Sequence, residues 1–203
     1  MHFRPILLSL AISALTVLGA DKVAYLNLET VFNEYYRTFQ ENYLFEQQTI
    51  SFQNRLKMMD EELQETTRKA EAARDAAEDD LRSQQEKEEA RRKFVGYVER
   101  IREKQAEIMQ FRETDGQQLH IKQTSTIRAL VQELTGKIKE YAKANGYTHV
   151  YEVSGLTSAQ SPVLLVYPDD QDITAAVTKF VNNGHEKELQ EAKKQIEELK
   201  AAQ

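Results

Sequence analysis

The sequence contains no cysteine and only three prolines among its 203 residues. Without cysteine, disulfides and thiolate metal sites are excluded, and so is a lipid-modified cysteine as a membrane anchor. No proline lies between residues 6 and 161. Very long helices are therefore permitted, because proline removes a helix hydrogen bond and clashes with the preceding turn. Aromatic residues make up only 8% of the chain and charged residues 30%, which fits solvated helices better than one compact globule.

Sequence signals for enzyme or cofactor chemistry are also absent. The histidines form no pair at metal-ligand spacing (His2, His120, His149 and His185). The chain has no glycine-rich phosphate loop and no nucleophile motif. Its net charge of −6 disfavours a basic nucleic-acid binder. We therefore expect a protein that is not an enzyme, needs no cofactor or metal, and does not bind nucleic acid.

Residues 1–20 have the layout of a secretory signal peptide. His2 and Arg4 precede an apolar run, and Gly19 and Ala20 end that run before the charged Asp21. The run is too short to span a bilayer comfortably, although an uncleaved N-terminal anchor is the alternative. Cleavage would remove Arg4 and change the net charge from −6 to −7. We expect an exported chain that does not insert stably into a membrane after cleavage.

Apolar residues then recur at heptad spacing in two long runs, which is typical of helices that pack along one seam. The side chains of the first run shrink from Phe and Leu to Ala, and those of the second run grow again after position 93. This symmetry predicts an antiparallel helical hairpin over 39–144 with its tip near 80–88. Residues 75–90 carry seven acids against two bases, a net charge of −5, which we interpret as a solvated face rather than a cation site. The first run is Phe45, Thr49, Phe52, Leu56, Met59, Leu63, Thr66, Ala70, Ala73 and Ala77; the second is Phe94, Val98, Ile101, Ile108, Ile127, Val131, Leu134, Ile138 and Tyr141.

The segments that flank this hairpin predict a small β-rich body built from residues 21–38 and 145–184. Short apolar segments predict strands near 22–28, 148–153 and 162–167, and a helix follows from about residue 173 to 181. The first strand should join the last two in one sheet at the base of the hairpin. Residues 185–203 form a charged tail with apolar residues at heptad spacing. The expected fold class is α+β, mostly α, with a long coiled-coil arm on a small β-rich body.

Both ends of this pattern resemble the Skp (OmpH-like) family of periplasmic chaperones. The opening DKVAYLNLETVFNEY of residues 21–35 is similar to the start of the mature family members. So is the stretch Tyr147–Val181, with its VYEV segment and the residues Asp172–Ala175 that open the last helix. The resemblance implies a jellyfish-like homotrimer whose arms enclose a cavity. It also implies that unfolded outer-membrane proteins are held there in the periplasm without ATP.

The resemblance therefore predicts an ATP-independent holdase that prevents aggregation of unfolded outer-membrane proteins. A structural coiled-coil spacer or scaffold of the cell envelope is the alternative from another class, since both functions need the helices. For client contact on the return arm we predict Tyr97, Met109 and Phe111, because Met and aromatic side chains suit varied apolar partners.

A second apolar stripe, beside the main seam, begins at Tyr36 and continues to Ile50. We favour packing against the body or a neighbouring subunit for it, and client contact is the alternative. The full set predicted for body or oligomer packing is Val23, Tyr25, Leu26, Tyr36, Phe39 and Tyr43.

Overall fold

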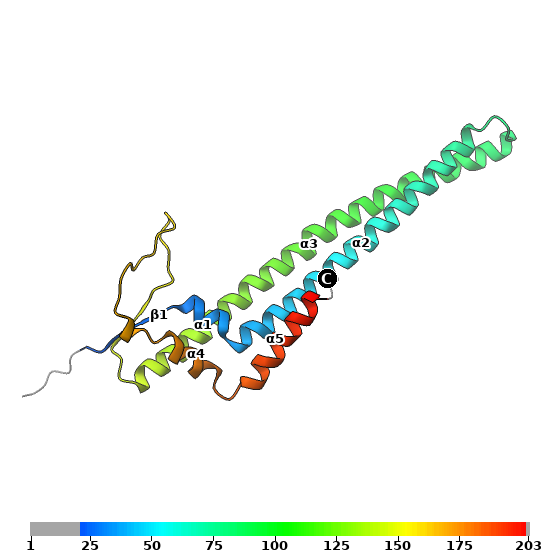
Figure 1. Ribbon diagram of the computed structural model, residues 1–203. Helices are drawn as coiled ribbons and strands as arrows, with labels where there is room; N and C mark the ends of the chain where they lie inside the picture. The colour runs from blue at the N-terminus through cyan, green and yellow to red at the C-terminus, as the bar shows by residue number, and fades with distance from the viewer. Residues whose placement is uncertain (1–20, 202–203) are drawn as a thin grey trace, which may run out of the picture.

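The computed structural model describes residues 21–201 and shows a long two-helix arm on a small base (Figure 1). The arm consists of α2 (Tyr36–Glu78) and α3 (Gln84–Ala144), which run antiparallel side by side. The predicted hairpin is therefore confirmed. The expected signal peptide lies outside the described residues.

Alanine lines the seam between α2 and α3 in the distal half of the arm. Ala70, Ala73 and Ala77 of α2 and Ala90 of α3 are buried, as the shrinking heptad residues predict. Small side chains allow two helices to approach closely, but they remove little apolar surface from water. The distal arm is consequently thin and weakly packed compared with the base.

Local interactions explain where α3 begins and where it ends. Ser83 caps its start in a capping box, in which Ser83 Oγ accepts from Glu86 N–H at 3.4 Å and Glu86 Oε2 accepts from Ser83 N–H at 2.9 Å. Gly146 ends the helix with a φ of +72°, a conformation that glycine adopts without steric cost. The reversal at residues 79–83 lies at the early edge of the predicted tip region.

The base contains a two-stranded parallel sheet. Strand β1 (Val23–Leu26) pairs with β2 (His149–Glu152), with Val23 opposite His149 and Leu26 opposite Glu152. On the other side of β1, Asp172 forms an isolated parallel bridge with Tyr25. The sheet thus joins the two halves of the chain at the root of the arm.

The core of the base lies where β1 meets three helices. It is formed by β1, the proximal end of α3, and the short helices α1 (Leu28–Glu34) and α4 (Thr174–Asn182). A 3-10 turn at Asp169–Gln171 leads into α4. The buried residues are Ala24, Leu26, Val31, Tyr35, Leu130, Leu134, Ile138, Ile173, Val177 and Val181.

The predicted strand at 162–167 is wrong. Pro162 makes one antiparallel bridge with Leu156, and no regular strand follows it within this segment. Val163, Leu165 and Val166 are exposed instead. The apolar pattern is that of a strand, and a strand needs a neighbour for its backbone groups. The Val163 N–H still donates to the Gly155 carbonyl at 2.9 Å, but no regular strand pairing continues through residues 164–167.

Two further expectations for the helices are also corrected. Ile127 is exposed, and Leu130 is buried in its place. Near the base the buried residues of α3 recur every four positions, because a straight α-helix drifts relative to a strict heptad and its buried face rotates. In addition, the arm helix begins at Tyr36 rather than at residue 39, because Tyr35, with a ψ of 132°, separates α1 from α2.

The charged tail forms the helix α5 (Glu186–Ala201), which returns along the proximal part of α2 (Figure 1). Gly184 turns the chain with a φ of +81°. At its root, the arm is therefore flanked by a third helix. None of the helices formed by residues 21–201 combines the length and apolar character needed to cross a membrane.

Candidate functional site

Polar contacts supplement the thin seam of the arm. Lys104 on α3 pairs with Glu62 on α2 at 2.7 Å, and Arg112 pairs with Asp60 at 3.4 Å. The hydrogen bond from Lys104 lowers the pKa of the Glu62 carboxyl. These groups are exposed, so water and salt screen the attraction, and the pairs align the helices more than they stabilise them.

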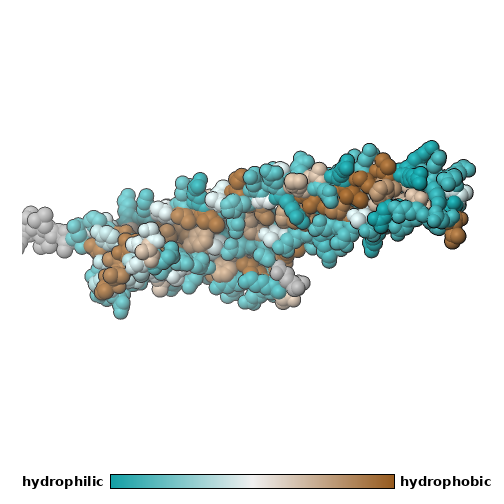
Figure 2. Space-filling view, turned by 90° about the horizontal axis from the view of Figure 1, so that it is seen from above, coloured by the Kyte–Doolittle hydropathy of each residue, from teal (hydrophilic) through white to brown (hydrophobic). Residues whose placement is uncertain are grey.

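Apolar side chains also point outward from this charged arm (Figure 2). Met58 on α2 is 52% exposed and Met109 on α3 is 66% exposed. Val95 and Ile121 are exposed on α3 as well. Isolated apolar residues are common on protein surfaces, but two flexible methionines on the same arm can adapt to apolar partners of different shape.

The three residues predicted for client contact lie in different environments. Met109 points into solvent, as a contact residue must. Tyr97 is half-buried, with the Arg100 guanidinium carbon 6.0 Å from its ring centroid. Phe111 stacks on Phe52 across the hairpin, with ring centroids 5.0 Å apart and an interplanar angle of 19°. Phe111 thus stabilises the arm itself and presents only part of its ring.

Sequence reasoning missed Met58, Val95 and Ile121. The sequence could have indicated them, because each is an apolar residue that lies outside the heptad positions of its helix. Met58 immediately precedes the seam residue Met59, so its side chain must leave the seam. The structure distinguishes these exposed residues from other off-seam residues, such as Phe111, whose side chains pack within the arm.

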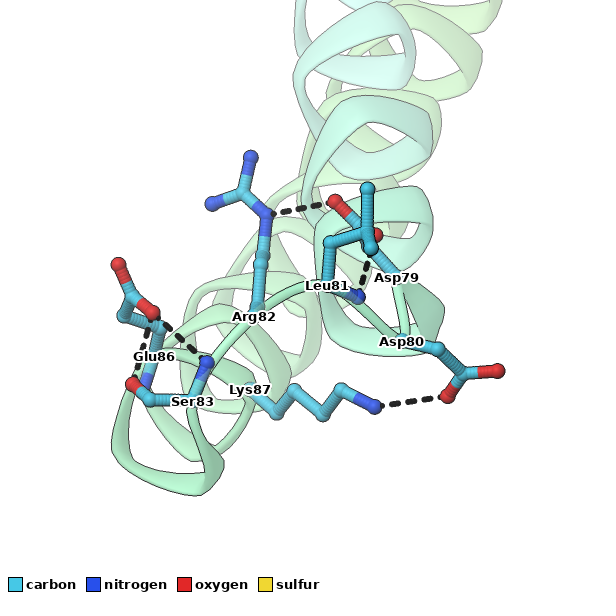
Figure 3. A network of polar contacts seen from close by, with 7 residues as sticks. All are labelled: Asp79, Asp80, Leu81, Arg82, Ser83, Glu86 and Lys87. Carbon is cyan, nitrogen blue, oxygen red and sulfur yellow. Dashed lines mark hydrogen bonds and ion pairs between the residues drawn. The ribbon is translucent and has the colours of Figure 1, made fainter.

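The turn at the tip of the arm is closed by its own side chains (Figure 3). Asp79 accepts the Leu81 N–H at 3.0 Å and pairs with Arg82 at 3.3 Å. The Leu81 hydrogen bond lowers the pKa of the Asp79 carboxyl. Lys87 pairs with Asp80 at 3.0 Å. Despite the surrounding charge, the Leu81 side chain is 96% exposed. The tip therefore presents one apolar side chain on a braced acidic turn.

At the base, the residues predicted for packing divide into two groups. Leu26 is buried in the core and Val23 is half-buried. Tyr25 stacks on Tyr151 and Tyr167, with ring centroids 5.9 and 5.0 Å away. These residues thus have contacts within the chain, and their predicted role in body or oligomer packing stays a prediction.

Tyr36, Phe39 and Tyr43 form the second group and are half-buried on the proximal part of α2. Tyr36 stacks on His185, with ring centroids 4.1 Å apart and nearly parallel planes. Lys193 of α5 lies 5.0 Å from the Phe39 ring centroid. The tail thus contacts the second apolar stripe, which sequence reasoning had assigned to the body or a neighbouring subunit.

A polar joint fixes the arm to the base around the interruption at Tyr35. The Tyr35 hydroxyl donates to Glu133 of α3 at 2.5 Å, and Arg37 pairs with the same carboxylate. Burial and the hydrogen bond to Glu133 raise the pKa of Tyr35 well above its usual range. Asn182 of α4 accepts the Tyr36 N–H at 2.8 Å. Residues from both halves of the chain therefore set the direction of the arm.

A groove of about 610 Å³ runs along the root of the arm beside β2. Its walls come from β1, the last turns of α3 and β2 itself. Its apolar lining includes Leu26, Leu28, Ile138, Ala142, Tyr147 and Val150. Nothing in the described residues groups three His, Cys, Asp or Glu side chains as a metal site. The geometry offers apolar contact surfaces instead.

These features define a class of protein: a helical-hairpin protein whose long, thin arm carries apolar contact residues and rises from a small base that joins both halves of the chain. A comparison with family models finds a match to the family described as "Outer membrane protein (OmpH-like)" over residues 22–181. The match spans most of the chain, so the protein belongs to the OmpH-like family, whose members are periplasmic chaperones of outer-membrane proteins. A search of curated proteins found no match.

Proposed function

We propose that the protein is an ATP-independent periplasmic holdase that binds unfolded outer-membrane proteins and prevents their aggregation. The observation that carries this proposal is the family match, which includes both the base and the whole arm. The signal-peptide pattern of residues 1–20 supports export to the periplasm. The outward Met58 and Met109 give the arm adaptable apolar contacts of the kind that a holdase needs.

The proposal includes a homotrimer, for which the base gives physical support. The segment Pro162–Val166 exposes the side chains of Val163, Leu165 and Val166, and Val166 is 84% exposed. The apolar groove beside β2 lies at the same end of the molecule. An exposed apolar strand-like segment and an apolar groove are a liability in a monomer, and association with further copies would cover both.

Client binding is proposed to be apolar and multivalent. The net charge of the chain without residues 1–20 is −7, so three copies carry about −21 and do not attract an acidic client over long range. Each arm offers only scattered apolar side chains, so a single contact is weak. Several linked contacts raise the overall affinity because the first one fixes the effective concentration of the others.

The test is to dilute an unfolded β-barrel membrane protein from denaturant and measure its aggregation by light scattering. A stoichiometric amount of the wild-type protein should suppress aggregation without ATP. The double variant Met58→Ser/Met109→Ser should bind the client about tenfold more weakly, since two adaptable apolar contacts are lost in every copy. The matched control Gln53→Ser/Gln110→Ser changes exposed polar residues of the same two helices and should behave as wild type.

Wild-type protein that leaves the client to aggregate would refute the holdase function and favour a spacer. A further measurement addresses the mechanism, because added salt should leave the affinity for an acidic client unchanged or raise it. A steep loss of affinity with salt would instead assign binding to basic patches such as Arg91–Lys93. Light scattering of the protein alone should give about three times the monomer mass.

A further inference from the structure

The helix α5 lies outside the region that matches the OmpH-like family, since the match ends at residue 181. It nevertheless packs on the part of α2 that carries Tyr36, Phe39 and Tyr43. The chain therefore adds to the family domain a segment that covers an aromatic surface of the arm. We call this surface the proximal stripe and define it as Tyr36, Phe39, Tyr43 and Ile50.

The two helices match in register. Tyr36 stacks on His185, and α5 runs from there in the same direction as α2 (Figure 1). Counting on by sevens from this stacked pair aligns Tyr43 with Ala192 and Ile50 with Leu199 in the sequence. Ala192 is only 2% exposed, which agrees with this register.

The helix α5 buries little of its surface against α2. Ala192 is its one buried residue in the described part of the chain, whereas Leu189, Ile196 and Leu199 stay partly exposed. A helix of 16 residues is marginal by itself in water, so α5 depends on docking for its structure. The turn at Gly184 joins α5 to the base, so a detached α5 would stay at high local concentration near α2.

We propose that the proximal stripe is a second contact surface for apolar segments of client polypeptides, and that α5 covers it until a client displaces the helix. The chemistry of the client segment follows from α5, which now covers the stripe and is an amphipathic helix with apolar side chains three or four residues apart. Aromatic rings bury large areas of varied apolar side chains, so an unfolded polypeptide with such a segment can take the same place. This inference rests on the proposed holdase function.

The arrangement lowers the apparent client affinity of the stripe by the fraction of molecules in which α5 is detached. If about one molecule in ten has α5 detached, detaching it fully raises the affinity of the stripe about tenfold, or about 1.4 kcal/mol. An idle chaperone would thus keep its aromatic surface covered and avoid self-association through it.

The experiment uses full-length chains without residues 1–20. Ala192→Asp introduces a carboxylate at the buried position of α5, and Gln190→Asp makes the same charge change at an exposed position. Detachment of α5 is followed by amide hydrogen exchange over 186–201, and client affinity by titration with an unfolded β-barrel membrane protein. We expect Ala192→Asp to speed exchange in α5 and to tighten client binding about tenfold, with Gln190→Asp as wild type. A peptide of residues 185–203 should restore the weaker binding of the Ala192→Asp variant.

A measurement on the wild type needs no substitution: client binding should speed hydrogen exchange in α5. Unchanged affinity in Ala192→Asp despite faster exchange would overturn the inference while leaving the holdase function intact. A fall in oligomeric mass in that variant would also overturn it, because α5 would then link one copy to another. If neither the wild type nor the variant holds client, the proposed function fails and this inference fails with it.

Discussion

The joint at Tyr35 can be tested through Asn182. Because α1 ends just before Tyr35, the Tyr36 amide is in the first turn of α2 and has no partner within that helix. Asn182 supplies the missing partner at 2.8 Å and also donates to the Glu34 carbonyl at 3.0 Å. Asn182→Ala removes both bonds. Leaving a buried polar group unsatisfied costs about 1–3 kcal/mol. Water can replace part of the lost interaction because the joint is near solvent, so we expect the loss of stability at the joint to stay within this range.

The assay is amide hydrogen exchange under native conditions. Every 1.4 kcal/mol is a tenfold change in an equilibrium constant, so the Tyr36 amide should exchange about 5 to 140 times faster in Asn182→Ala. The neighbouring Asn183 is exposed, and Asn183→Ala is the matched control. Equal Tyr36 exchange in both variants would refute the reasoning, since it would show that the Asn182 side chain does not hold the joint.

Two further predictions concern the base. Leu134→Ala should lower the free energy of unfolding by about 2.5–5 kcal/mol because it empties a fully buried site, whereas Ile127→Ala at an exposed site should cost under about 1 kcal/mol. Urea unfolding at equal protein concentration measures both, and similar losses would contradict the packing of α3. Burial acts to raise the pKa of Glu152, but hydrogen bonds from Ser154, Leu28 and Gly155 outweigh it and lower the pKa below 4.5. The unfolded chain therefore takes up the proton first, so this stabilisation is present above about pH 4.5 and is lost as the pH falls through the folded pKa. Glu152→Gln should flatten the acid side of the stability profile, and a profile unchanged from that of the exposed control Glu29→Gln would contradict the assignment.

The hairpin could be predicted from sequence because its cause is local. A heptad spacing that shrinks to alanine and grows again describes two helices and a reversal without reference to the rest of the chain. The interruption at Tyr35 could not be predicted in this way. No proline or glycine marks it, and the group that satisfies the Tyr36 amide comes from Asn182, 146 positions away.

The errors at the base have similar origins. Residues 162–167 have the composition of a strand, but pairing depends on a neighbour that local sequence does not specify. Leu130 replaces Ile127 in the core because the buried face of α3 rotates over many turns. Of the two exposed off-seam methionines, Met109 is among the predicted contact residues and Met58 is not. Phe111 shows the limit of that criterion, because only the structure reveals its stacking on Phe52.

The parallel pairing of β1 with β2 has a consequence for how the chain folds. The register joins Val23 to His149, 126 positions apart. Closing an open loop of this length costs about 4 kcal/mol in chain entropy by the logarithmic rule, before any fixed term. Pairing of α2 with α3, however, brings the two strand segments near each other. An arm that forms first would therefore act as a template for the base, and β1, which is synthesised first, has no partner until β2 is available.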